Sequence, residues 1–175
     1  MKSDSSFCRT LATAGTAIAL AIGTVSCGAS GEPDRRTQVA EKGRSVMPFD
    51  LERTTHRFTK SSNGGVQTVV ADDPGDQEQI RLIREHLTKE FAAFQRGDFA
   101  DPASIHGAEM PGLSTLAQGY KRIQMSFETV QNGARILFTT DDAGLVDALH
   151  AWFDAQVSDH GRHAEHGQPR HGRGH

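Results

Sequence analysis

The stretch IQMSFETVQNGARILFTTDDAGLVDALHAWFD, residues 123–154, decides the fold that we expect, because its hydrophobic pattern changes once from period two to period 3.6. Apolar residues alternate at Ile123, Met125 and Phe127, which predicts a strand with one buried face. Asn132-Gly133 then predicts a two-residue type I′ turn that leads into a second strand. The segment therefore predicts a β-hairpin followed by a helix.

The predicted helix follows the pair Asp141-Asp142, where a carboxylate can cap the first turn and interact favourably with the helix dipole. Leu145, Leu149 and Trp152 form an apolar stripe along one side of this helix. A one-sided helix needs a surface to cover, and the preceding hairpin supplies one.

Residues 55–87, THRFTKSSNGGVQTVVADDPGDQEQIRLIREHL, repeat the same plan with a turn at Asn63-Gly64 and a second Asp-Asp pair before a helical pattern. Neither hairpin can bury its apolar side alone. We therefore expect an α+β domain over residues 49–158, in which two ββα units form a four-stranded antiparallel sheet with helices packed on one face.

The start of the chain indicates export. A short basic segment precedes an uncharged apolar run from Leu11 to Val25, which at about 15 residues is shorter than the roughly 20 needed to span a membrane. We expect residues 1–26 to be a removable signal peptide. The four residues ending at Cys27 resemble a lipobox, which makes Cys27 the expected lipidation site. Ordinary cleavage nearby is the alternative, because a lipobox usually has leucine where Thr24 stands.

Removal of the signal would leave Cys27 as the single cysteine, so the mature protein would contain no internal disulfide. Residues 27–48 combine Gly, Ser, Pro and mixed charge, which predicts a flexible tether that lifts the domain from a membrane. The expected location is the outer side of the cytoplasmic membrane or the periplasm. A formal net charge of −3 argues against a nucleic-acid partner.

Candidate metal ligands lie in the segment from Gly97 to Pro111, which is rich in Gly, Pro and Asp and is expected to be an irregular loop. His106 and Met110 stand four residues apart in it. Imidazole with thioether suits copper, particularly Cu(I), whereas imidazole with the Glu109 carboxylate suits Zn(II) or Cu(II). The alternative is that His106 caps a turn and Met110 fills the core.

The end of the chain, residues 159–175, is expected to be a disordered His-rich tail. Its candidate metal ligands are His160, His163, His166 and His171. Flexible spacing can bring several neutral imidazoles to one transition-metal ion. The alternative is a solvated tail, because the arginines interspersed with these histidines repel cations.

Further candidate ligands lie within the predicted domain: His56, His86 with Glu90, and His150 with Asp154. Each pair places imidazole and carboxylate on one helix face, a spacing that permits shared ligation and equally an ordinary surface hydrogen bond. Aligning the apolar stripes of the two helices places Trp152, rather than His150, opposite His86. The strand face that His56 shares with Phe58 favours a core histidine with a hydrogen-bond partner.

Motifs of common enzyme classes are missing from the sequence. It has no G-x-S-x-G, no H-E-x-x-H and no Gly-rich phosphate loop. Lipidation of Cys27 would also remove a Cys–His nucleophile pair. An enzyme is therefore not the function that the sequence favours.

A family resemblance rests on four segments: MPFDLERTTHRFTK (47–60), GGVQTVVADDPGDQEQIRLIREHL (64–87), FQRGDFADPASIHGAEMPGLSTL (94–116) and DALHAWFDAQVSDHG (147–161). Together they resemble a family of small exported bacterial proteins often labelled aspartate carbamoyltransferase. Carbamoyltransferases have two α/β domains and a Ser-Thr-Arg-Thr phosphate motif that opens a helix. This chain has Arg53-Thr54-Thr55 at the start of a predicted strand. The resemblance therefore implies neither transferase activity nor a particular site residue.

The sequence thus predicts a cell-envelope lipoprotein that binds or buffers copper or zinc without catalysis. The first alternative is an envelope interaction module, whose sheet or central loop contacts another protein and whose histidines are incidental. A transferase or hydrolase is the second. Exposed apolar residues on the open sheet face would favour the interaction module, whereas convergence of His106 with Met110 and a third donor would favour metal.

Overall fold

A computed structural model describes residues 34–168, and the structural statements below concern this part of the chain. Three sequence predictions lie outside it: the export signal of residues 1–26, lipidation of Cys27 and the role of His171. Within residues 34–168, no helix is both long and apolar enough to cross a membrane.

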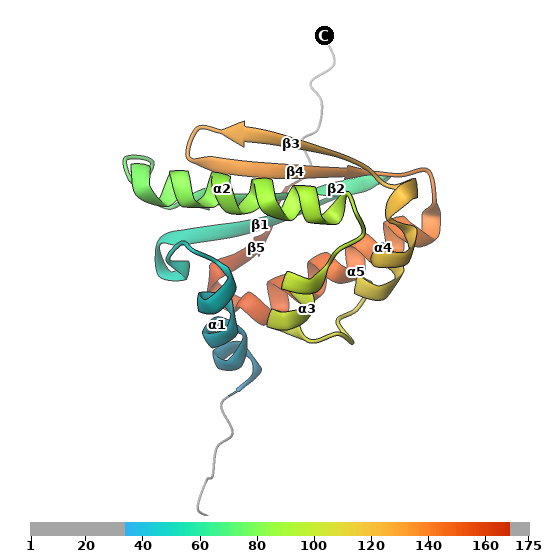
Figure 1. Cartoon of the computed structure of the whole chain (residues 1–175), viewed down its shortest axis with the longest axis horizontal. Helices are drawn as coiled ribbons and strands as arrows, with labels where there is room; N and C mark the ends of the chain where they lie inside the picture. The colour runs from blue at the N-terminus through green and yellow to red at the C-terminus, as the bar shows by residue number, and fades with distance from the viewer. Residues whose placement is uncertain (1–33, 169–175) are drawn as a thin grey trace, which may run out of the picture. The chain divides into compact units, whose positions relative to one another are not determined.

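The fold is α+β, as predicted, and Figure 1 shows helices packed against one mixed sheet. In chain order the elements are α1 (Arg35–Val46), η1 (Leu51–Arg53), β1 (Thr54–Ser61), β2 (Gly64–Ala71), α2 (Gln77–Phe94), α3 (Ala100–His106), α4 (Leu113–Gly119), η2 (Tyr120–Arg122), β3 (Gln124–Val130), β4 (Gly133–Thr139), α5 (Ala143–His160), η3 (Gly161–His163) and β5 (Ala164–His166), where η marks a short 3-10 helix.

The sheet has the strand order β3-β4-β2-β1-β5. Both predicted hairpins form, β1 with β2 and β3 with β4, and the two hairpins join where β2 and β4 pair antiparallel. The predicted four-stranded sheet is incomplete, because β5 adds a fifth strand parallel to β1, with His56 opposite Ala164. This short strand covers an edge of β1 whose backbone groups would otherwise need water.

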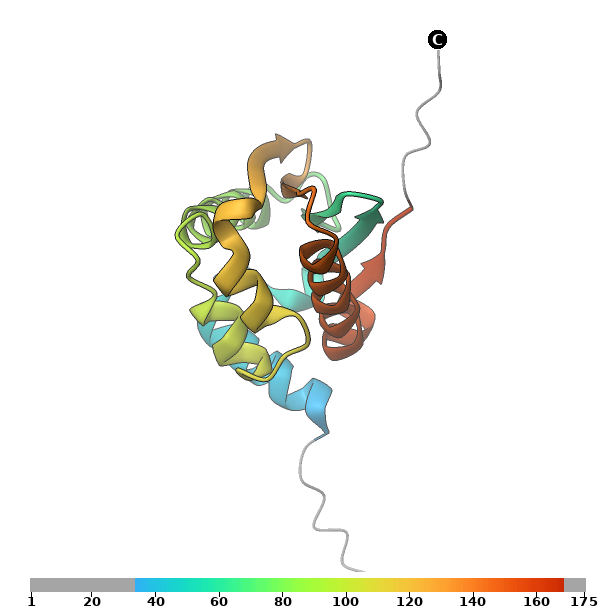
Figure 2. The same cartoon turned by 90° about the vertical axis from the view of Figure 1, so that its right-hand side faces the viewer.

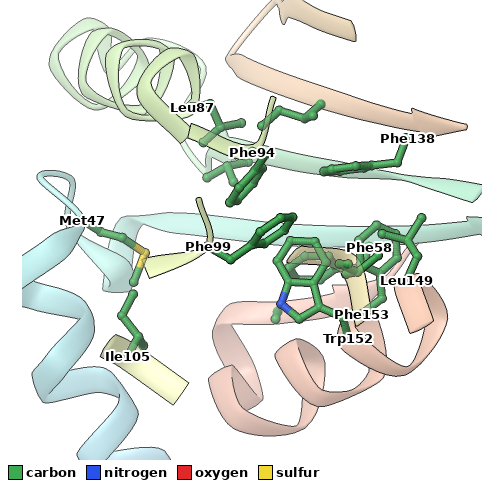
Figure 3. Close-up of a cluster of buried hydrophobic side chains, with 14 of the residues drawn as sticks. Met47, Phe58, Leu87, Phe94, Phe99, Ile105, Phe138, Leu149, Trp152 and Phe153 are labelled. Atoms are coloured by element: carbon green, nitrogen blue, oxygen red, sulfur yellow. The ribbon is translucent and has the colours of Figure 1, made fainter. Parts of the chain in front are cut away.

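The helices cover one face of the sheet. On that face Phe58, Val69, Ile136 and Phe138 are buried against the stripes of α2 and α5, and Figure 3 shows Trp152 of α5 among the buried rings. Helix α4 packs against α5, and Figure 2 shows the two helices from the side on which α4 lies. The opposite face of β2 and β4 is only partly buried.

Both hairpin turns lie one residue earlier than the Asn-Gly pairs predict. Ser61 pairs with Gly64 and Val130 with Gly133, so the glycines begin the second strands. Their role is close packing of β2 on β4. A Cβ on Gly64 would lie 2.0 Å from the Phe138 carbonyl oxygen, and one on Gly133 would lie 2.0 Å from the Val69 carbonyl oxygen.

The tether predicted for residues 27–48 is not irregular over its second half, because residues 35–46 form α1. Asp34 caps this helix by accepting a hydrogen bond from the Thr37 backbone N–H. Its weak apolar pattern conceals it in the sequence, whereas long-range contacts hold it: Arg35 forms an ion pair with Asp159 of α5.

The first residues of the predicted disordered tail form regular secondary structure instead. His160 is the last residue of α5, His163 belongs to η3 and His166 to β5. The backbone here is ordered by pairing with β1, and the Gly167 N–H continues this pairing by donating to the Phe58 carbonyl. The central loop likewise contains a helix, α3, which ends at His106.

Candidate functional site

Several histidines predicted separately as metal ligands line one narrow cavity of about 40 Å³ between the helices and the sheet. They come from four different elements: His56 from β1, His86 from α2, His106 from α3 and His160 from α5. The other side chains that line the cavity include Met47, Gln67, Glu90, Asp101, Trp152 and Gln156. The fold therefore joins four imidazoles that lie far apart in the sequence.

His106 is held by a charged pair behind it. Its Nδ1–H donates to Asp159 Oδ2 at 2.9 Å, because a carboxylate can only accept. Arg35 donates to the same carboxylate at 2.6 Å and to the His106 carbonyl oxygen at 2.9 Å. This tautomer leaves the lone pair on Nε2, and the Gln156 side chain is a further hydrogen-bond partner of the ring. Histidines that bind metals usually have such a carboxylate partner on the other nitrogen.

His56 is buried, with only 3% of its surface exposed, and its Nδ1 has no hydrogen-bond partner. The His163 carbonyl accepts a hydrogen bond from the other ring nitrogen. His56 therefore has one fixed donor and one free lone pair. The sequence predicted a core histidine whose polar groups are satisfied, whereas in the structure the Nδ1 atom of His56 has no hydrogen-bond partner.

The imidazoles lie close together. The ring centres of His56 and His160 are 5.0 Å apart, and those of His106 and His160 are 4.9 Å apart. The His56 and His160 rings are stacked, with an interplanar angle of 5°, so the rings would have to turn for their in-plane lone pairs to meet on one tetrahedral ion. Phe49 connects His86 to this group, because its ring contacts both His56 and His86.

Burial keeps these imidazoles uncharged. It lowers the pKa of His56 to about 3 and that of His86 to about 4. Burial also holds the pKa of His160 well below its ordinary value and lowers the pKa of His106, although Asp159 acts in the opposite direction on His106. At neutral pH all four side chains present lone pairs rather than positive charge.

Glu90 and Asp101 are the carboxyl groups that line the cavity, and Glu90 is 6% exposed. Burial raises the pKa of Glu90 to about 8, and a hydrogen bond with Asp101 contributes in the same direction. The pKa of Asp159 instead falls, because the hydrogen bonds from Arg35 and His106 outweigh the effect of its burial. Glu90 and Asp159 therefore have opposite charge states at neutral pH.

Three buried polar atoms in residues 34–168 lack a hydrogen-bond partner, and all three belong to this cavity: His56 Nδ1, Gln67 Oε1 and Trp152 Nε1. Unpartnered buried polar groups are costly and rare. A cavity of this size holds an ion or a few waters, whereas pockets for organic ligands are about 300–1,000 Å³. The cavity thus suits a small polar guest.

Other predicted ligands lie elsewhere. Met110 is buried and lines a separate hollow together with His106, Glu109 and Asp159, so the predicted pair His106 and Met110 shares a hollow that lies outside the imidazole cavity. His150 Nε2–H donates to the carbonyls of Ser61 and Gly64 and so holds the first hairpin. Asp154 forms an ion pair with Lys60 rather than sharing a ligand with His150.

His163 and His166 lie outside the cavity lining. His163 Nε2 is 3.2 Å from Glu52 Oε1 at the surface, and His166 Nε2 is 3.9 Å from the Asp154 carboxylate. Within residues 34–168, no three His, Cys, Asp or Glu side chains are arranged to hold a metal ion as they stand. Ligation in the cavity would require the imidazole rings to rotate.

Sequence reasoning missed Met47, Gln67, Trp152 and the Arg35–Asp159 pair as parts of this site. The spacing of Trp152, Gln156 and His160 along α5 offers one signal, because residues four apart lie on one helix face.

Comparison with known proteins adds no identity. No protein-family model, curated protein or solved structure matches this chain.

Proposed function

We propose that this protein is an exported lipoprotein that binds a transition metal, copper or zinc, at the imidazole cavity. The observation that carries the proposal is the group of four imidazoles on one cavity, with the buried Nδ1 of His56 lacking any partner. Imidazole suits zinc and copper. The resemblance of residues 47–161 to small exported bacterial proteins and the lipobox-like sequence at Cys27 support the cell-envelope part of the proposal.

The surroundings of His106 also support metal binding. Its carboxylate partner, Asp159, fixes the tautomer and is itself fixed by Arg35, an arrangement that raises ligand basicity in metal sites. Metal ligation by histidine requires the neutral ring. The lowered pKa values of the cavity histidines supply that form without a preceding loss of protons.

The decisive experiment is calorimetric titration of the purified protein with Zn(II) and with Cu(II) at pH 7. Trp152, the single tryptophan, lines the cavity, so quenching of its fluorescence by Cu(II) gives a local signal. We expect one tight site that is lost in His56→Asn and in His160→Asn. His150→Asn is the matched control, because His150 bonds to hairpin carbonyls outside the cavity.

Truncation after Gln168 separates the cavity from the end of the chain, because it removes His171 and retains β5. Full binding by the truncated protein is expected. Equal affinity in wild type and both cavity variants, with circular dichroism showing that they fold, would overturn the proposal. So would loss of binding on truncation.

An interaction module is the second candidate function, and one observation favours it. A hollow of about 640 Å³ on the uncovered sheet face is lined by the partly exposed side chains of Val66, Val70 and Leu137. Exposed apolar surface of this kind can receive a protein partner. Replacing Val66 and Leu137 by Thr would abolish partner capture from an envelope extract under this alternative and would leave metal binding unchanged.

A further inference from the structure

A thioether lines the same cavity as the four imidazoles. It belongs to Met47, the residue that ends α1, and is 6% exposed. Its backbone N–H donates to the Gly43 carbonyl at 2.7 Å, which anchors the residue to the helix. Figure 3 shows the Met47 side chain extending toward Ile105 of α3, the residue next to His106.

The absence of a side chain at Gly43 creates the space that Met47 occupies. A Cβ on Gly43 would lie 2.6 Å from the Met47 terminal methyl group. The methyl end is therefore packed against α1, and the rest of the side chain lies between α1 and the cavity. Among the other methionines of residues 34–168, Met110 lines a different hollow, which it shares with His106 but with none of the other three cavity histidines, and Met125 lies on β3.

Thioether sulfur is a soft ligand that prefers copper, and imidazole with thioether particularly suits Cu(I). The charge of the ion favours the same choice. The desolvation cost of an ion rises with the square of its charge, so a monovalent ion is less costly to bury than a divalent one. Zinc gains nothing comparable from a thioether, because it prefers thiolate, imidazole and carboxylate.

We infer that the cavity is selective for copper(I), with Met47 as a thioether ligand beside the imidazoles of His56, His106 and His160. This inference rests on the metal-binding function proposed above. It gives the thioether role to Met47 rather than to Met110, because Met47 lines the cavity with all four imidazoles, whereas Met110 shares a hollow with His106 alone among them.

The test is an anaerobic competition titration of the purified protein with bathocuproine disulfonate for Cu(I), and with a zinc-binding dye for Zn(II). Met47→Leu removes the sulfur and keeps a similar apolar volume. We expect it to weaken Cu(I) binding by at least about tenfold and to leave Zn(II) binding within about twofold. The tenfold figure is a lower bound, because it is the smallest loss typical of removing even an outer-shell partner of a metal site. Met110→Leu, also buried, should change neither affinity.

X-ray absorption at the copper edge of the wild-type complex provides a measurement that does not depend on folding of the variant. It should show sulfur in the first coordination shell. A shell of nitrogen alone, or unchanged Cu(I) affinity in folded Met47→Leu, would overturn this inference while leaving metal binding intact. Failure of the wild-type protein to bind either metal in the cavity would instead overturn the proposed function itself.

Discussion

Acidification tests the electrostatics of the cavity without any metal. Between pH 7 and pH 5, an unfolded chain protonates histidine at a pKa of about 6.5, whereas burial lowers the pKa of His56 to about 3 and that of His86 to about 4. The unfolded state then binds more protons than the folded state, so the free energy of unfolding falls as the pH falls. At about 1.4 kcal/mol per pH unit below 6.5, each of the two histidines removes about 2 kcal/mol by pH 5.

Glu90 acts with the opposite sign. Its pKa is raised to about 8 in the folded protein, so between pH 8 and its unfolded pKa the folded state holds a proton that the unfolded state releases. Lowering the pH from 7 to 5 therefore increases the free energy of unfolding through Glu90, by about 2 to 3 kcal/mol. This gain offsets much of the loss caused by His56 and His86.

Glu90→Gln separates the two effects, because the amide resembles the protonated carboxyl and does not titrate. From pH 7 to pH 5 we expect the variant to lose about 2 to 3 kcal/mol more stability than the wild type. Urea unfolding with a chelator present, followed by the fluorescence of Trp152, measures this difference. Glu85→Gln, on the exposed side of α2, should behave as the wild type. An equal or smaller acid-induced loss in Glu90→Gln would refute the reasoning.

Three further predictions follow from the fold and the site. Gly133→Ala places a methyl group 2.0 Å from the Val69 carbonyl oxygen, so urea unfolding should show a loss of about 2 kcal/mol or more; an unchanged midpoint would contradict the packing argument. Asp159→Asn removes the negative charge that holds His106 and should weaken cavity metal binding about 10–100-fold by calorimetry, whereas Glu165→Gln should not. Cys27→Ser should abolish a lipid-dependent mass shift in bacterial cells, and a wild-type precursor without that shift would rule out lipidation.

Part of the site was accessible from residue types alone. His56, His86, Glu90, His106 and His160 were all candidates from the sequence, and all of them line the cavity. Their convergence was not readable, because it depends on where four separate elements pack. Closeness in the sequence suggested Met110 as a partner of His106, and the two share a hollow outside the cavity, whereas only the packing of α1 brings Met47 to the cavity itself.

The sequence by itself determined the two hairpins, the two long helices and the α+β class. These features depend on residues a few positions apart, whose periodic burial and turn chemistry act within each segment. Tertiary structure decided the rest. Arg35 and Asp159 are separated by 124 residues, and the pairing of β5 with β1 likewise joins distant segments. Such contacts hold α1 and β5 in place because packing brings their partners together, and no pattern within one segment predicts them.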